Sequence, residues 1–260
     1  MDGTTTNTAP GMERPAYLAR IAADAALFAA AARAVGPNAA IPTCPEWSMR
    51  ELVLHQGEVH RWAAAVVRDR VAKLSMVADD FLGPLPDDEN LVAWFEAGAA
   101  GLIDTLAAAP ADLQCATFLA DPPAPVVFWS RRQTHETAMH RVDAESATGT
   151  ITPFAPEYAA DGIDEMLTGF VPRKHTPLHA DPPITLAVHL VDVGGDWHLT
   201  ISAEPAVAAR EQRSADCAVS GTASDVYLAL WNRQGTVPLQ IEGDPSVLEM
   251  FRDNVKVKWS

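Results

Sequence analysis

Two residues that could bind a metal ion lie four positions apart in the segment 129–145, which is predicted to be helical: Glu136 and His140. At about 3.6 residues per turn, positions i and i+4 lie only about 40° apart around a helix, so a carboxylate and an imidazole can bind one ion from the same face. A third ligand must come from elsewhere, and His55 is the best donor because it lies in an apolar stripe that predicts an inward position. The alternative for Glu136 and His140 is a solvated pair that stabilises the helix by only about 0.2–0.5 kcal/mol.

The dipeptide His135-Glu136 invites comparison with the zinc-protease motif H-E-x-x-H, whose two histidines are four positions apart. In this chain His135 and His140 are five apart, so on a helix they point about 140° away from each other. The spacing therefore argues against that motif and makes Glu136 a candidate ligand instead of a general base. His60 is offset from the stripe of His55 and is a weaker candidate. The alternative for His55 is a core histidine with a satisfied hydrogen bond.

The composition indicates a globular protein and excludes several classes of partner. Of the 260 residues, 48% are hydrophobic and 20% are charged, which is enough apolar material for two modest domains. A net charge of −15 repels phosphate backbones and anionic membrane surfaces, so we expect neither nucleic acid nor membrane as a partner. No stretch reaches the roughly 18 uninterrupted apolar residues that a membrane span needs, and residues 1–13 lack the basic start and apolar run of a signal peptide, so we expect a cytoplasmic protein.

The three cysteines Cys44, Cys115 and Cys217 are widely spaced and form no C-x-x-C pattern. Neither a disulfide framework nor a thiolate zinc site is therefore predicted.

The first 170 residues are predicted to be almost entirely helical, after a mobile tail over residues 1–13. Ser48 and Glu51 match a capping box, which begins the helix that carries His55. Other helices are predicted over 17–35, 91–108, 129–147 and 156–170. Four long helices with one long connection predict an up-down four-helix bundle, a fold in which metal sites are commonly built from side chains on facing helices.

The predicted secondary structure changes from helix to a mixture of strands and helices after the proline-rich segment 173–183. Residues 184–192 alternate in the manner of a strand, and Gly194-Gly195 predicts a tight turn into a second strand over 197–201. The remaining predictions are a strand over 217–221, a helix from the Thr222 cap to about 233, a strand over 239–243 and a helix over 245–255. The sequence therefore predicts a helical bundle over 14–171 and a smaller α+β domain over 183–258.

Four motifs resemble the mycothiol-dependent maleylpyruvate isomerase family. They are Cys44-Pro-Glu-Trp-Ser-Met-Arg-Glu-Leu-Val-Leu-His55, Glu136-x-x-x-His140-Arg-x-Asp-Ala-Glu145, Gly221-Thr-Ala-Ser-Asp-Val-Tyr-Leu-Ala-Leu-Trp-Asn-Arg233 and Glu242-Gly-Asp-Pro245. The resemblance extends in order over about residues 15–255. It implies a DinB-like metal-binding bundle followed by a sterol-carrier-like α+β domain.

The resemblance also implies a chemistry. A divalent metal, most often zinc, would be bound by His55, Glu136 and His140, with mycothiol as the thiol cosubstrate. Two imidazoles and one carboxylate leave one position open on four-coordinate zinc, as in catalytic sites, and a thiol bound there becomes a nucleophilic thiolate. The family further implies an arginine near the substrate carboxylates, for which Arg233 is the best match. The alternative for Arg233 is a surface residue at a helix end.

Three functions stay open from the sequence. The first is a mycothiol-dependent metalloenzyme, either a maleylpyruvate-type cis–trans isomerase or a thiol S-transferase, acting on a small electrophile. The second is a non-catalytic, metal-containing protein that binds a small molecule in detoxification or resistance. The third is a bundle in which the same three residues form a buried polar network without metal. We expect a monomer or a homodimer.

Overall fold

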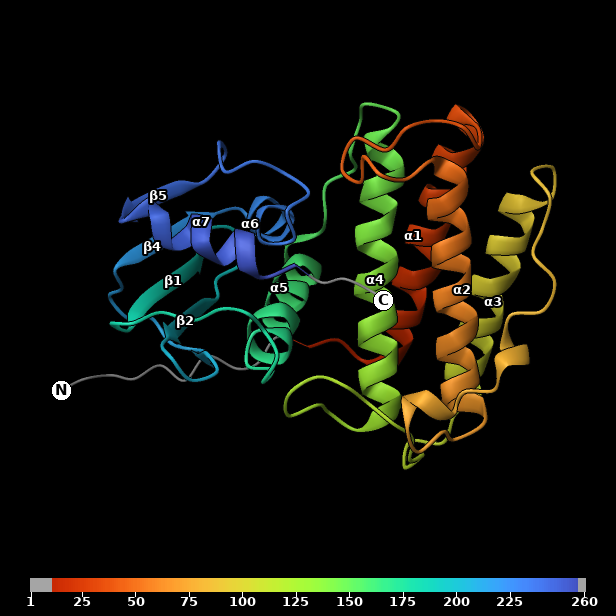
Figure 1. The fold of residues 1–260 in the computed structure, drawn as a ribbon, viewed down its shortest axis with the longest axis horizontal. Coiled ribbons are helices and arrows are strands. Elements are labelled where there is room, and N and C mark those ends of the chain that lie inside the picture. The colour runs from red at the N-terminus through yellow and green to blue at the C-terminus, as the bar shows by residue number, and fades with distance from the viewer. Residues whose placement is uncertain (1–10, 257–260) are drawn as a thin grey trace. The chain divides into compact units, whose positions relative to one another are not determined.

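The computed structural model describes residues 11–256 of the chain, which group by contact into two compact units (Figure 1). One unit contains residues 12–118 and 122–152 and is helical, and the other contains residues 119–121 and the chain from 153 onward and includes a sheet. The predicted class of fold, a helical bundle followed by a smaller α+β unit, is confirmed. Most of the predicted mobile tail, and positions 257 and 258 of the predicted second domain, lie outside the described residues.

Four helices form the first unit, and local sequence signals mark where two of them, the second and the fourth, begin. The capping box is present, because Ser48 accepts a hydrogen bond from the Glu51 N–H while the Glu51 carboxylate accepts one from the Ser48 N–H. Pro125 occupies the first turn of the last helix, where proline is favoured, so that helix begins before the predicted Trp129. The helices are α1 (Arg14–Val35), α2 (Met49–Arg68), α3 (Leu91–Ala108) and α4 (Pro125–Ser146), with short 3₁₀ turns η1 (Leu74–Met76) and η2 (Asp79–Phe81) between α2 and α3.

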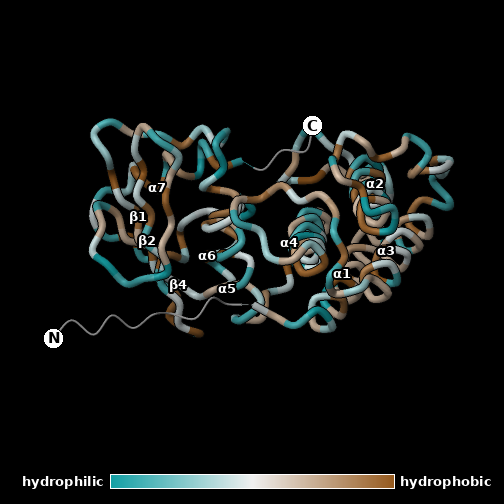
Figure 2. Tube along the Cα trace, turned by 90° about the horizontal axis from the view of Figure 1, so that it is seen from below, coloured by the Kyte–Doolittle hydropathy of each residue, from teal (hydrophilic) through white to brown (hydrophobic). Residues whose placement is uncertain are grey.

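Apolar side chains of α1, α2 and α3 form a continuous core, in which Phe28 and Phe95 stack with their ring centroids 4.4 Å apart. The last helix of the bundle differs in composition, as the hydrophilic colour along α4 in Figure 2 shows. Its polar residues are nevertheless buried, among them Gln133, Glu136, His140 and Asp143. Buried polar groups need hydrogen-bond or metal partners inside the protein, so we expect a functional site of the bundle to lie along α4.

Among the described helices, α3 is long and apolar enough to span a membrane by length and composition. Its apolar residues Leu91, Phe95 and Leu102 are buried in the bundle. A core helix of a soluble protein passes the same test, so this is weak evidence for a span.

The second unit begins with helices and continues as a five-stranded sheet of order β3-β2-β1-β4-β5. Strand β1 pairs antiparallel with β2 and parallel with β4, and β4 pairs antiparallel with β5. The turn between β1 and β2 has Gly194 and Gly195 at positive φ, as the predicted hairpin requires. The elements are α5 (Pro156–Asp164), the π-helical turn η3 (Glu165–Phe170), β1 (Ile184–Leu190), β2 (Asp196–Ile201), β3 (Val207–Ala209), β4 (Cys217–Gly221), α6 (Ala223–Leu230), β5 (Gln240–Gly243) and α7 (Pro245–Asn254).

Two features of this unit differ from the sequence-based expectation. The predicted helix over 156–170 is α-helical only to Asp164 and continues as η3, and by contact it groups with the sheet. Its attachment includes polar contacts, since the buried Asp164 carboxylate accepts hydrogen bonds from Trp197 on β2 and from Arg210 just after β3. Strand β3 was not predicted, because three residues are too short for an alternating pattern to be visible.

Candidate metal centre

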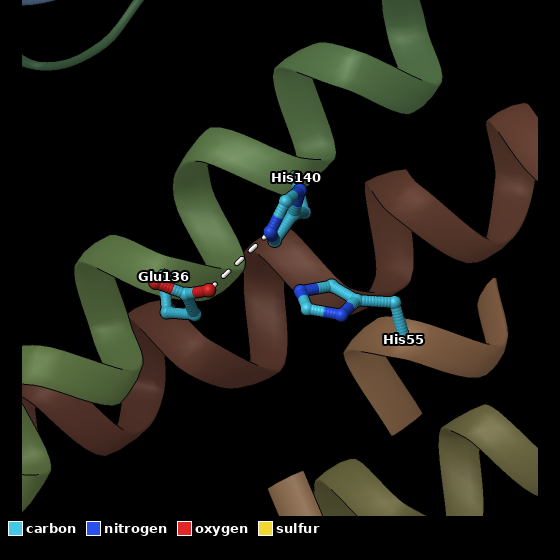
Figure 3. A group of neighbouring side chains, drawn as sticks. All are labelled: His55, Glu136 and His140. Carbon is cyan, nitrogen blue, oxygen red and sulfur yellow. Dashed lines mark ion pairs between the residues drawn. The ribbon is translucent and has the colours of Figure 1, made fainter. Parts of the chain in front are cut away.

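His55, Glu136 and His140 come together inside the bundle (Figure 3). The side chain of His55 extends from α2, while Glu136 and His140 extend from neighbouring turns of α4 toward it. One potential ligand atom from each residue lies within 4.8 Å of the other two. Glu136 and His140 are buried, with 2% and 7% of their surfaces exposed, and His55 is partly buried.

The atoms that face one another are polar but poorly satisfied. His140 Nε2 lies 3.3 Å from Glu136 Oε1, an ion-pair distance, yet Oε1 accepts no hydrogen bond of normal geometry from the described residues. His55 Nε2 is also buried without a hydrogen-bond partner there. An unsatisfied buried polar atom is costly, and these two atoms are an imidazole nitrogen and a carboxylate oxygen, which are good metal donors. The donor set therefore fits a divalent ion.

Other side chains hold two of the three residues in place. Asp143 Oδ2 accepts a hydrogen bond from His140 Nδ1 at 2.9 Å, which leaves Nε2 as the nitrogen that faces Glu136. Arg132 donates to the other carboxylate oxygen of Glu136, Oε2, at 3.1 Å. The Trp47 ring lies against both imidazoles, with centroid distances of 4.8 Å to His55 and 6.1 Å to His140.

The protonation states without metal follow from this packing. Burial and the nearby His140 charge lower the pKa of His55 to about 4, so it is neutral at pH 7. Burial alone would raise the pKa of Glu136, but contact with His140 and the Arg132 charge outweigh it and lower that pKa to about 2. Burial alone would lower the pKa of His140, but its bonds to Asp143 and Glu136 raise it to about 9. Two of the three groups therefore have the protonation state that a metal ligand needs.

The other residues considered in the sequence analysis, His135, His60 and Arg233, lie outside this cluster. His135 is buried on α4 and is not part of the cluster, as its spacing predicts. His60 is fully buried and contacts Gln56 and Thr137. Arg233 belongs to the second unit, where it follows α6 and donates to the Trp231 carbonyl at 3.1 Å.

Sequence reasoning missed two polar residues that support the cluster, Asp143 and Thr43. The i, i+3 spacing of His140 and Asp143 was a visible signal for the first. No local pattern marks Thr43, which donates a hydrogen bond to Asp143 from 100 positions earlier in the chain.

Two family models match the chain. The model of the mycothiol maleylpyruvate isomerase N-terminal domain matches residues 18–145, and that of the C-terminal domain of the same isomerases matches residues 157–249. The chain belongs to the mycothiol-dependent maleylpyruvate isomerase family. The predicted family is thereby confirmed, and with it membership of an enzyme family that uses a low-molecular-weight thiol and a small-molecule substrate.

Solved structures agree with this assignment at the level of the fold. A crystal structure of a mycothiol-dependent maleylpyruvate isomerase has a TM-score of 0.57 to this chain at 12% sequence identity. A histidine-to-alanine variant of a mycothiol-dependent maleylpyruvate isomerase gives 0.60 at 12% identity. Each comparison covers 89% of this chain and 93% of the other. No curated protein matches the sequence.

Proposed function

We propose that this protein is a cytoplasmic, metal-dependent enzyme in which the thiolate of mycothiol attacks a small electrophilic substrate. The observation that carries the proposal is the meeting of His55, Glu136 and His140, where His55 Nε2 and Glu136 Oε1 have no hydrogen-bond partner among the described residues. Family membership supports the use of mycothiol. A divalent ion held by this set, with zinc as the first choice, would act as a Lewis acid that lowers the pKa of a bound thiol.

The residues of the chain have distinct tasks in this proposal. His55 presents a neutral imidazole and Glu136 a negative carboxylate, so neither must lose a proton before binding an ion at pH 7. Arg132 holds the second carboxylate oxygen, which leaves Oε1 as the donor atom. Asp143 holds His140 by Nδ1 and thereby directs Nε2 to the same point. Trp47 covers one side of both imidazoles with an apolar surface and keeps water from that side.

The reaction that fits the family is a cis–trans isomerisation of a maleylpyruvate-type substrate. The thiolate sulfur adds to one carbon of the cis double bond, and the electron pair of that bond moves onto the neighbouring carbonyl oxygen. The former double bond can then rotate, and expulsion of the thiolate restores the double bond in the trans form. An S-transferase would share the first step and keep the new C–S bond. Binding of the substrate carboxylates remains the predicted role of Arg233, because a guanidinium bonds two oxygens at once.

Metal analysis tests the ligand assignment directly. Purified protein and the variants His55→Ala and Glu136→Gln are measured for bound metal, with His175→Ala as a control because His175 is exposed in the second unit. We expect about one equivalent of divalent metal in the wild type and the control, and loss of most of it in the other two. Equal metal content in all four proteins would show that the ion binds elsewhere.

Turnover separates an enzyme from a non-catalytic binding protein. Metal-loaded protein is incubated with mycothiol and maleylpyruvate, and in parallel with mycothiol and a panel of other electrophiles. Trans product formed with mycothiol unchanged identifies an isomerase, and a stable thioether identifies an S-transferase. Binding of an electrophile with neither product would support the alternative, a metal-containing protein for detoxification or resistance.

A further inference from the structure

The seven residues Ile41–Trp47, here called the 41–47 loop, connect α1 to α2 and are closed on themselves. Ala40 and Ser48 form an isolated antiparallel bridge at the base of the loop, and the Met49 N–H donates to the Ala39 carbonyl at 2.8 Å. Inside the loop, the Trp47 N–H donates to the Cys44 carbonyl at 2.9 Å. The loop is therefore a compact unit, whose parts are expected to move together.

Thr43 bonds the loop to α4. Thr43 Oγ1 donates to Asp143 Oδ1 at 2.6 Å and lies 3.2 Å from Ser146 Oγ. Asp143 is fully buried, and its other oxygen accepts the bond from His140 Nδ1. A continuous chain of hydrogen bonds thus leads from the loop, through one carboxylate, to one imidazole of the metal centre.

The same loop also contacts the centre through an aromatic ring. Trp47 is only partly buried, and its ring packs against His55 and His140. Two residues of one short segment therefore connect to the same imidazole, Thr43 by hydrogen bonds through Asp143 and Trp47 by ring contact. Any change in the orientation of the His140 ring must be accommodated by this segment.

We propose that Thr43 and Asp143 are positioning residues that hold the His140 ring with Nε2 toward the ion, and that through them the 41–47 loop responds to metal occupancy. This inference rests on the proposed metal function. The hydrogen bond that orients a ligating histidine fixes both its tautomer and its ring plane, and loss of such an outer partner typically weakens metal binding 10–100-fold. The 41–47 loop thereby forms one wall of the metal centre, and this wall is more rigidly ordered when the ion is bound.

The test compares the variants Thr43→Val, Thr43→Ser and Asp143→Asn with the wild type. Valine keeps the shape of threonine but removes the hydroxyl, whereas serine keeps the hydroxyl. Thr105→Val is the control, because the Thr105 hydroxyl bonds within its own helix α3, to the Gly101 carbonyl. Zinc affinity is measured by competition with a chromophoric chelator, coordination by the visible spectrum of the cobalt-substituted protein, and folding by thermal melting without metal.

We expect zinc binding to weaken about 10-fold in Thr43→Val and about 10–100-fold in Asp143→Asn, with an altered cobalt spectrum, and to be preserved in Thr43→Ser and Thr105→Val. Amide hydrogen exchange in the 41–47 loop should slow when zinc is added to the wild type, and respond much less in Thr43→Val. Wild-type affinity and an unchanged cobalt spectrum in both Thr43→Val and Asp143→Asn would overturn the inference while the proposed function stands. A wild-type protein that binds no zinc would rule out both this inference and the proposed metal-dependent function.

Discussion

Acid sensitivity of the bundle is expected from His60, which lies fully buried on α2. Its Nε2 lies 2.8 Å from the Gln56 side-chain amide and 2.9 Å from Thr137 Oγ1. Thr137 Oγ1 donates to the Gln133 carbonyl at 2.7 Å, so toward the ring its oxygen can only accept, whereas the Gln56 amide nitrogen can only donate. The Nδ1 atom is buried without a partner in the part of the chain that the structure describes. A doubly protonated ring would carry an N–H at Nδ1 that meets no acceptor among the described residues.

The sign and size of the effect follow from the pKa. Burial is the main cause that lowers the pKa of His60 to about 3, with Glu136 opposing the shift and the charges of Arg61, His140 and His55 adding to it. The same side chain in the unfolded chain has a pKa of about 6.5. As the pH falls below about 6.5 the unfolded state takes up a proton that the folded state does not, so stability is lost by up to roughly 1.4 kcal/mol per pH unit. Between pH 6.5 and 4.5 the loss is about 2 kcal/mol.

The variant His60→Gln tests this reasoning, because glutamine can keep an amide near Thr137 but cannot take up a proton. Urea unfolding of metal-free protein is followed by circular dichroism at pH 7.5, 6.0 and 4.5, with the exposed His175→Gln as control. We expect the variant to be less stable than the wild type at pH 7.5 and to lose about 2 kcal/mol less on going to pH 4.5. A gap between wild type and variant that stays constant across the three pH values would refute a neutral, buried His60.

Two further predictions concern packing and a buried ion pair. A Cβ at Gly57 would overlap the Trp94 ring, so Gly57→Ala should lower the free energy of unfolding by about 1–3 kcal/mol. Gly101→Ala is the control and should not destabilise its helix, because a Cβ there has no atom of the described residues within 4 Å. Urea unfolding of the two variants side by side checks this. Asp164→Asn removes the negative charge that faces Arg210. Because that arginine is partly exposed, we expect the free energy of unfolding to fall by a moderate amount, about 2 kcal/mol. Faster amide exchange in β2 and η3 would report this loss. Unchanged exchange in these segments would mean that the ion pair does not hold them together.

The sequence by itself determined most of the local structure. Helix α2 begins at its capping box because Ser48 and Glu51 satisfy each other's backbone groups without help from the rest of the chain. The bounds of α3 follow from a periodic apolar stripe ended by Pro110, and β4 agrees with its predicted residues. The pairing of Glu136 with His140 is also local, because helical geometry alone places positions i and i+4 on one face.

Only the tertiary structure decided what completes the candidate site. His55 could have been a core histidine, and it becomes a candidate ligand because the packing of α2 beside α4 brings its Nε2 to Glu136 and His140. Thr43 and Asp143 meet across 100 positions, and no local propensity encodes a contact of that separation. Contacts also decided that α5 groups with the sheet. Local signals arise from neighbours along the chain, whereas a binding site requires side chains that the whole core brings together.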